Sequence, residues 1–304
     1  MDRLIELIEK KNNPTVVGLD TRLSFIPQFI KNEAMLKFKE DDEKASAYAI
    51  LQFNKIIVDE IKDIVPAIKL QMACYEAFGV FGIKALKETA LYIKNCGLYV
   101  IFDGKRNDIG SSMECYSNAY LGKTKLLNGR KYSPFYCDSL TINPYLGSDT
   151  IKTVLKDCIQ FNKTVFVLLK TSNPSSFEIQ NIKDKENKNV FEKVFEICNE
   201  IGKTTTGKYG YQKIGVVVGA TQKKELEYLR KTLKNVFFLV PGYGAQGASA
   251  KDIVVAFENK KGAIINSSRQ ILCSWQKNNE EEKNFAKAAR KEAEKMRDEI
   301  NKLI

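Results

Sequence analysis

Two aspartates and two lysines form the most reactive pattern in the sequence. Asp103, Lys105 and Asp108 follow one another at the end of the apolar run LYVIFDGK, and Lys69 belongs to the run before it. Carboxylates and ammonium groups that alternate in space keep one another charged, so Lys105 is expected to stay protonated and able to donate a proton. The alternative is a buried ion-pair network for stability, but desolvation offsets most of its attraction. The pattern therefore favours electrostatic catalysis.

A glycine-rich segment and an arginine form a second pattern. Gly242, Gly244 and Gly247 permit close approach of the backbone to a ligand, and Gln246 brings amide donors. Arg269 follows the next apolar run and offers a guanidinium fork that matches a phosphate. Glycines in a turn can be purely structural. With an arginine at the end of the next run, they predict a phosphate site.

Several residue types are missing or rare. The sequence contains no histidine, which excludes Ser-His and Cys-His dyads and histidine metal motifs. Its 7 cysteines are odd in number and include no C-x-x-C pair, which indicates free thiols in a reducing compartment. No apolar stretch approaches the ~20 residues that span a bilayer. We therefore expect a soluble, cytoplasmic protein with no membrane partner.

The formal net charge is +11, yet lysines are interleaved with acids in segments such as KDKENK and KKELEYLRK. Solvated helix faces and loops explain this distribution best. The alternative is electrostatic steering of a small anionic substrate. A nucleic-acid partner is not expected, because the basic and aromatic motifs of the usual binding modules are missing.

Eight short β-branched runs must position these residues, and most are separated by segments with helical periodicity. Runs such as VFVLL are apolar almost throughout, as expected when helices cover both faces of a parallel sheet. The repeat predicts an α/β fold, a (β/α)8 TIM barrel with extra terminal helices and loop insertions, as a single domain over residues 1–304. A doubly wound open sheet is the alternative. The predicted strands are 15–20, 66–71, 98–105, 139–144, 164–172, 213–221, 237–244 and 262–269.

In such a barrel the C-terminal ends of the strands form the reactive face. Asp103 and Lys105 are two residues apart, so both should leave their strand toward the barrel axis. Charged groups that converge from consecutive strands make a purely structural role improbable. The other polar residues at predicted strand ends are Asp20, Lys69, Gln71, Asn143, Thr171, Ser172, Asn173, Ser267, Ser268 and Arg269.

Two segments, 121–138 and 173–188, lack a clean strand or helix pattern. We expect an interface loop at the first and a lid at the second, with simple surface insertions as the alternative. Ser111 and Glu114 have the spacing of a capping box, which would start a helix directly behind Asp108.

These residues resemble the orotidine 5′-monophosphate decarboxylase family through its Asp-x-Lys-x-x-Asp signature at Asp103, Lys105 and Asp108, with Lys69 upstream. The wider similarity is to the longer, bacterial-type branch, and it departs from that pattern at Gly104 and Asn107. Neither departure changes a charged residue, so both bear on loop geometry. The strings that carry the resemblance are VVGLD, PAIKLQMACYE, DGKRNDIGS, TINPYLGSD, KTSNPSS, VVVGAT, VPGYGAQG and INSSR.

The resemblance implies decarboxylation of orotidine 5′-monophosphate (OMP) to UMP in pyrimidine synthesis, without a metal or organic cofactor. Asp103 would then face the substrate carboxylate and Lys105 would deliver the proton to C6. It also implies a homodimer in which Asp108 reaches the partner's ribose, with Ser112 assisting. The other substrate-binding residues would be Asp20 and Lys69 at the ribose, Thr171 and Ser172 at the pyrimidine edge, Gln71 and Pro241 in the pocket, and Gly244, Gln246, Gly247, Ser268 and Arg269 around the phosphate.

Two rival functions stay open from the sequence. The Asp-x-Lys-x-x-Asp triplet is shared with sugar-phosphate decarboxylases of the same superfamily, which are usually magnesium-dependent. A barrel that keeps only the phosphate site, and binds nucleotides or nucleic acid without catalysis, belongs to a different class.

Overall fold

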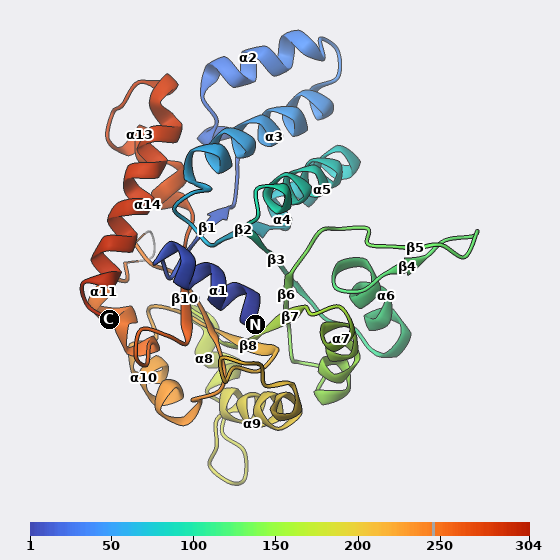
Figure 1. Cartoon of the computed structure of the whole chain (residues 1–304), viewed down its shortest axis with the longest axis vertical. Coiled ribbons are helices and arrows are strands. Elements are labelled where there is room, and N and C mark those ends of the chain that lie inside the picture. The colour runs from blue at the N-terminus through green and yellow to red at the C-terminus, as the bar shows by residue number, and fades with distance from the viewer. Residues whose placement is uncertain (245–246) are drawn as a thin grey trace.

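Eight parallel strands close into a barrel in the computed structural model, which describes residues 1–244 and 247–304. Around the barrel the strands follow the order β1-β10-β9-β8-β7-β6-β3-β2, and helices surround them (Figure 1). The predicted (β/α)8 fold is therefore confirmed, and the open doubly wound sheet is wrong. The strands are β1 (Thr15–Leu19), β2 (Ala67–Gln71), β3 (Tyr99–Arg106), β6 (Ser139–Ile142), β7 (Thr164–Lys170), β8 (Ile214–Val218), β9 (Phe238–Pro241) and β10 (Ala263–Ser267).

The helices between successive strands pack their apolar faces on the outside of the barrel. The longest is α3 (Asp42–Ile61), whose apolar residues recur at helical spacing and are buried. The predicted final helix is α14 (Phe285–Asn301), which packs on α3 and α12. The other principal helices are α2 (Gln28–Lys37), α5 (Gly79–Asn95), α6 (Gly110–Tyr120), α7 (Ser148–Gln160), α9 (Val190–Gly202), α10 (Lys223–Thr232), α11 (Ala250–Ile253), α12 (Arg269–Leu272) and α13 (Ser274–Lys277).

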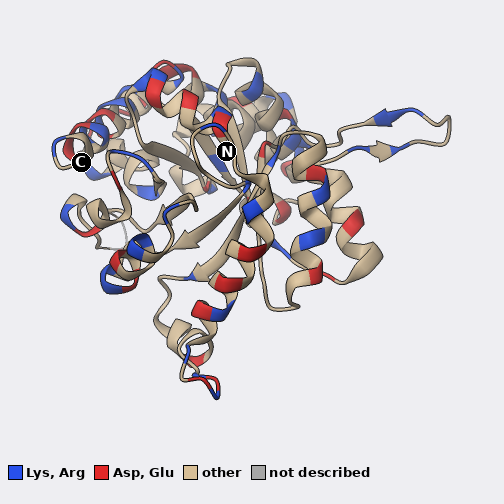
Figure 2. Ribbon diagram, turned by 60° about the horizontal axis from the view of Figure 1, so that its bottom comes forward, with Lys and Arg blue, Asp and Glu red and all other residues tan. Residues whose placement is uncertain are grey.

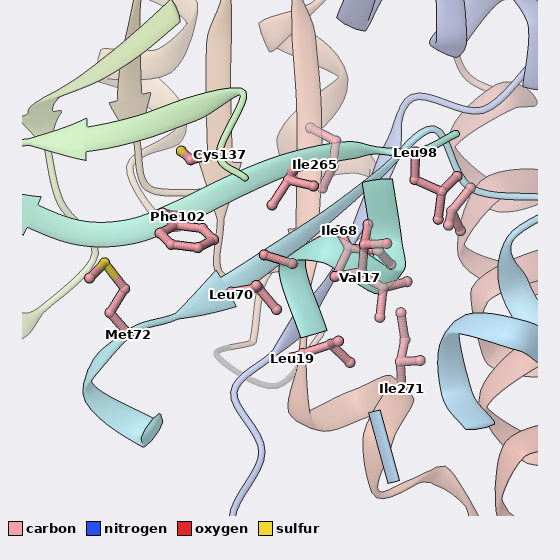
Figure 3. Packing of buried hydrophobic residues seen from close by; sticks show 14 of the residues in the cluster. Val17, Leu19, Ile68, Leu70, Met72, Leu98, Phe102, Cys137, Ile265 and Ile271 are labelled. Atoms are coloured by element: carbon pink, nitrogen blue, oxygen red, sulfur yellow. The ribbon is translucent and has the colours of Figure 1, made fainter. Parts of the chain in front are cut away.

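Strand alternation divides the core into two clusters. Val17 and Leu19 of β1 point outward to the helices, together with Ile68, Leu70 and Phe102 (Figure 3). The intervening residues of the same strands, such as Val16, Ala67 and Ile101, point inward and form a second cluster with α1 (Asp2–Lys11). Because α1 fills one end of the barrel, the functional side chains gather at the other end, where the strands finish.

The two segments without a clean pattern are insertions of different kinds. Residues 121–138 contain a small antiparallel pair, β4 (Thr124–Lys125) and β5 (Lys131–Tyr132), which projects away from the barrel (Figures 1 and 2). The other insertion carries a short helix, α8 (Phe177–Gln180), and a bridge between Lys183 and Asn189. Whether either acts as an interface loop or a lid stays a prediction.

The predicted capping box at Ser111 and Glu114 is wrong. Helix α6 already begins at Gly110, so Ser111 lies inside its first turn and cannot be the N-cap. Ile109 takes the cap position without a side-chain bond, because β3 continues to Arg106 and the turn after it is short. Capping boxes do form at Asn189 with Glu192, and at Ser249 with Asp252.

Charged residues are distributed over the outer helices, with lysines and arginines beside aspartates and glutamates (Figure 2). Ion pairs on these helices include Lys231 with Glu227 and Arg290 with Glu294. This arrangement fits solvated helix faces. Within the described residues, no helix combines the length and apolar character needed to cross a membrane.

Candidate active site

A cavity of about 720 Å³ opens at the C-terminal ends of the barrel strands. It brings together residues that are far apart in the sequence, from Asp20 after β1 to Arg269 after β10. The reactive pattern and the phosphate pattern therefore share one cavity. The predicted site residues that line it are Asp20, Lys69, Gln71, Asp103, Lys105, Thr171, Ser172, Pro241, Ser268 and Arg269.

Lys69 and Asp103 meet because both occupy inward positions of neighbouring strands. Lys69 is two residues after the inward-facing Ala67, and Asp103 is two after Ile101. The Lys69 side chain is buried, with Nζ 3.0 Å from Asp103 Oδ2 and 3.3 Å from Asp20 Oδ1. Gln71 adds a bond from Nε2 to Asp103 Oδ2 at 3.2 Å.

Lys105 reaches the same carboxylate through an irregular stretch of β3. Its Nζ lies 2.7 Å from Asp103 Oδ1. The pairing of β3 with β6 shifts register between Phe102 and Arg106, and Lys105 has a φ of 48°. Asp103 and Lys105 both line the cavity as predicted, but Lys105 does so through a bulge, in place of the regular strand alternation expected from the sequence.

Thr141 on β6 holds this bulge and was missed by the sequence reasoning. It donates from Oγ1 to Asp103 Oδ1 at 2.9 Å and accepts the Lys105 backbone N–H at 2.9 Å. The sequence predicts Asn143 as the polar residue at the end of this strand, but its Oδ1 accepts the N–H of Tyr145. Thr141 is two residues earlier, so strand alternation could have identified it.

The charges of this network stabilise one another. Burial raises the pKa of Asp103, but attraction to Lys69 and Lys105 outweighs it and holds the pKa below its usual range. Burial lowers the pKa of Lys69, and attraction to Asp103 and Asp20 more than offsets this, so its pKa lies above the usual value. The Asp103 carboxylate therefore lies between the ammonium groups of Lys69 and Lys105 in the cavity.

Asp108 and Ser112 stand apart from the network. Of the residues that the structure describes, neither is among those lining the cavity. Asp108 Oδ1 accepts the N–H of Ile109 at 2.8 Å, and Ser112 is exposed on α6. Within one chain, the structure thus joins three of the four predicted catalytic residues.

The phosphate pattern is assembled from two loops. Pro241 and Arg269 line the main cavity, whereas Gly244 borders a smaller adjoining cavity that it shares with Arg269. Gly247 is exposed with a φ of 92°, a conformation that favours glycine. Gln246 lies outside the described residues.

Other lining residues were also missed. Gln180 of α8 receives the Thr171 N–H on Oε1 at 3.0 Å and donates from Nε2 to Thr171 Oγ1 at 2.7 Å. It follows the predicted strand end by nine positions in an insertion without periodicity, so no sequence signal pointed to it. The remaining additions are Arg22, Ser24, Phe25, Leu168, Val217, Leu239, Tyr243 and Asn266. Asn173, Gly242 and Ser267, which the sequence also indicated, line the cavity too.

The two departures from the family pattern have different surroundings. A Cβ at Gly104 would lie 2.5 Å from Met72 Sδ, so Met72 occupies the space that a larger residue would need. Asn107 buries its Oδ1 without a hydrogen-bond partner in the described part of the chain. The same part of the chain brings together no group of three or more cysteine, aspartate or glutamate side chains suited to hold a metal ion.

Comparison with known proteins gives a consistent result. A sequence model of the orotidine 5′-phosphate decarboxylase / HUMPS family matches residues 51–283. A relative from Caldicellulosiruptor saccharolyticus, named orotidine 5′-phosphate decarboxylase, is 41% identical over 304 residues, which are 100% of this chain and 98% of the relative. One of the same name from Clostridium perfringens is 40% identical over 303 residues, with the same coverage of both chains.

The fold agrees with these relatives. A solved structure from Streptomyces avermitilis, described as an orotidine 5′-phosphate decarboxylase, has a TM-score of 0.76 and 26% identity, covering 98% of this chain and 95% of that one. The family model covers most of the chain, and the curated relatives match it along its whole length. The chain therefore belongs to the orotidine 5′-phosphate decarboxylase / HUMPS family and is a decarboxylase, as its motifs predict.

Proposed function

We propose that this chain converts OMP to UMP and carbon dioxide in the cavity at the strand ends, through the charges of Lys69, Asp103 and Lys105. One observation carries the proposal. The Lys69–Asp103–Lys105 chain of contacts and Arg269 line the same cavity, so one nucleotide can meet both. The names of the full-length relatives support this substrate.

The reaction breaks the bond between C6 of the pyrimidine and the carboxylate carbon. Carbon dioxide leaves, the electron pair stays on C6, and a proton from Lys105 Nζ forms the new C–H bond. Lys105 is then neutral and regains a proton from solvent. Asp103 faces the departing carboxylate, and Lys69 holds Asp103 charged and in place.

No single contact supplies the whole rate enhancement. The carbanion has no nearby electron sink, so the barrier must fall by an amount on the order of 20 kcal/mol. Two charges ~4 Å apart interact by about 4 kcal/mol at an effective dielectric constant of ~20. The remainder comes from dipoles that are already oriented and from binding energy of the remote phosphate.

The other cavity residues bind the substrate. Asp20, beside Lys69, holds a ribose hydroxyl. Thr171 and Ser172 read the edge of the pyrimidine, and Gln71 and Pro241 line the pocket. At the far end the phosphate is bound by Arg269 and Ser268 with the glycine-rich loop, including Gly244, Gln246 and Gly247.

A homodimer completes the site in this proposal, with Asp108 reaching the partner's ribose and Ser112 assisting. Ile109, Tyr145 and Leu146 support it, because they are exposed apolar residues on the loops that follow β3 and β6. Analytical ultracentrifugation tests the dimer, and a monomer with full activity contradicts it. We also infer a cytoplasmic location, supported by the seven free cysteines.

The decisive experiment is a spectrophotometric assay that follows loss of OMP absorbance, with and without EDTA. Activity that survives EDTA supports the proposal. Turnover of a sugar phosphate only, lost with EDTA, supports the magnesium-dependent relatives. Binding of UMP without turnover of OMP supports a non-catalytic barrel.

A further inference from the structure

Helix α14 contacts the loop after β9 and the short helix α12 after β10, which border the phosphate end of the cavity. The hydroxyl of Tyr243, in the loop after β9, donates to Glu299 Oε2 at 2.5 Å. Gln270, directly after Arg269, donates from Nε2 to Glu292 Oε1. Glu292 and Glu299 are seven residues apart, which is about two helical turns, so they lie on one side of α14.

Tyr243, in the loop after β9, is buried beside α14. The residue as a whole is 5% exposed, although it also borders the main cavity. Its carbonyl oxygen accepts a bond from Ser267 Oγ at 3.5 Å, at the end of β10. A hydroxyl that donates to a carboxylate forms a charge-assisted bond, which is stronger than a neutral one. The backbone around Tyr243 is thus tied to both β10 and α14.

Gln270, in the first turn of α12, links this helix to the loop after β9. A Cβ at Gly244 would lie 1.3 Å from Gln270 Oε1, so the Gln270 amide occupies the space above Gly244. Gly244 also has a φ of 72°, which other residues rarely adopt. The carboxylate of Glu292 fixes the Gln270 amide in this position. The loop after β9 and helix α12 therefore pack against each other at Gly244 and Gln270. Helix α14 bonds to both of them, through Glu299 to Tyr243 and through Glu292 to Gln270.

We propose that Tyr243, Gln270, Glu292 and Glu299 are positioning residues that set the spacing between the glycine-rich loop and Arg269 for the substrate phosphate. The inference rests on the proposed function, because it needs the phosphate to bind between these loops. Groups that are already in place lose less freedom when the ligand binds. Loss of either link therefore weakens ligands that carry the phosphate and spares those without it.

The test compares UMP with uridine by calorimetry in Tyr243→Phe, Glu299→Ala and Gln270→Ala. Each variant should bind UMP about tenfold more weakly, the equivalent of one lost hydrogen bond to a charged group, and uridine within about twofold of wild type. KM for OMP should rise accordingly. Glu299→Gln keeps an acceptor for the Tyr243 hydroxyl and should fall between wild type and Glu299→Ala. Glu294→Gln is the matched control, since Glu294 pairs with Arg290 on the same helix.

A double variant distinguishes positioning from general damage to the fold. Tyr243→Phe combined with Glu299→Ala should bind UMP no more weakly than the worse single variant, because both remove the same link. Equal weakening of UMP and uridine, or unchanged UMP binding in variants with wild-type melting temperatures, overturns the inference. Arg269→Ala is measured alongside. If Arg269→Ala weakens UMP and uridine equally, the phosphate site of the proposed function is wrong. If Arg269→Ala weakens UMP more than uridine and the other variants do not, only the inference fails.

Discussion

The two ends of the cavity are built in opposite ways. At the β2–β3 end, Lys69, Asp103, Lys105 and Thr141 lie on or directly beside strands and bond one another. At the β9–β10 end, the residues lie in the loop after β9 and at the start of the short helix α12 after β10, and side chains of α14 bond to both from outside. In the proposed reaction, the charges that must be oriented beforehand lie on the strands, whereas the proposed phosphate site depends on a loop and a short helix that α14 supports. The difference suggests a division between chemistry and binding.

The largest effect is expected from removing Lys105, the proposed proton donor. Lys105→Ala should lower kcat at least about 10³-fold, because a positioned acid and a positive charge beside the carbanion are both lost. Binding of UMP should stay within a few-fold of wild type. Stopped-flow or single-turnover assays and calorimetry measure the two quantities. Near-normal turnover in this variant would reject the proton-donor role.

The matching change at the other end is Arg269→Ala. It should weaken UMP about 100-fold through loss of a charge-assisted contact, with uridine nearly unchanged. Calorimetry with both ligands measures the difference. If the affinity for uridine falls as much as that for UMP, Arg269 is not a phosphate ligand. The cavity would then have no phosphate-binding end, and the proposed division between chemistry and binding would be wrong.

A smaller effect is expected where the strand scaffold supports the charges. Thr141→Val removes the bond to Asp103 and leaves the Lys105 backbone N–H without its acceptor. One unsatisfied buried donor costs about 1–3 kcal/mol, so kcat should fall roughly tenfold with little change in UMP affinity. Thr141→Ser keeps the hydroxyl and serves as the control. A change in UMP affinity without a change in kcat would assign Thr141 to binding.

The sequence predicted the barrel well because eight β-branched runs and helical periodicity recur along the chain. It predicted the inward direction of Asp103 because strand alternation fixes the direction of each side chain, and it predicted Lys69 from its place on the neighbouring strand. Strand alternation places Thr141 on the same face as Asn143, but its bonds to Asp103 and Lys105 depend on the bulge in β3 and its pairing with β6, which local sequence does not reveal. Tyr243 and Gln180 were missed because their roles depend on contacts with residues remote in sequence or in an irregular insertion. The single-domain division and the place of Asp108 in a dimer stay predictions.

The smallest effect is expected from pH, because the charges of Asp103 and Lys69 should not change over a wide pH range. The folded-state pKa of Asp103 lies below its ordinary 3.8, so its contribution to stability is present above that value and is lost as pH falls through the folded pKa. The pKa of Lys69 lies above its ordinary 10.5, so its contribution is present below that value and is lost as pH rises through the folded pKa. Both groups thus stay charged between about pH 5 and 9.

Carbon-13 NMR of the aspartate carboxylates in wild type tests this expectation, and Asp103→Asn serves only to assign the Asp103 signal. The chemical shift of the Asp103 carboxylate should stay constant from about pH 9 to 5 and change only below about pH 4. A shift that changes between about pH 5 and 9 would mean that Asp103 titrates there. The charges at this end would then not be fixed in advance, and the contrast with the loop-built phosphate end would lose its electrostatic basis.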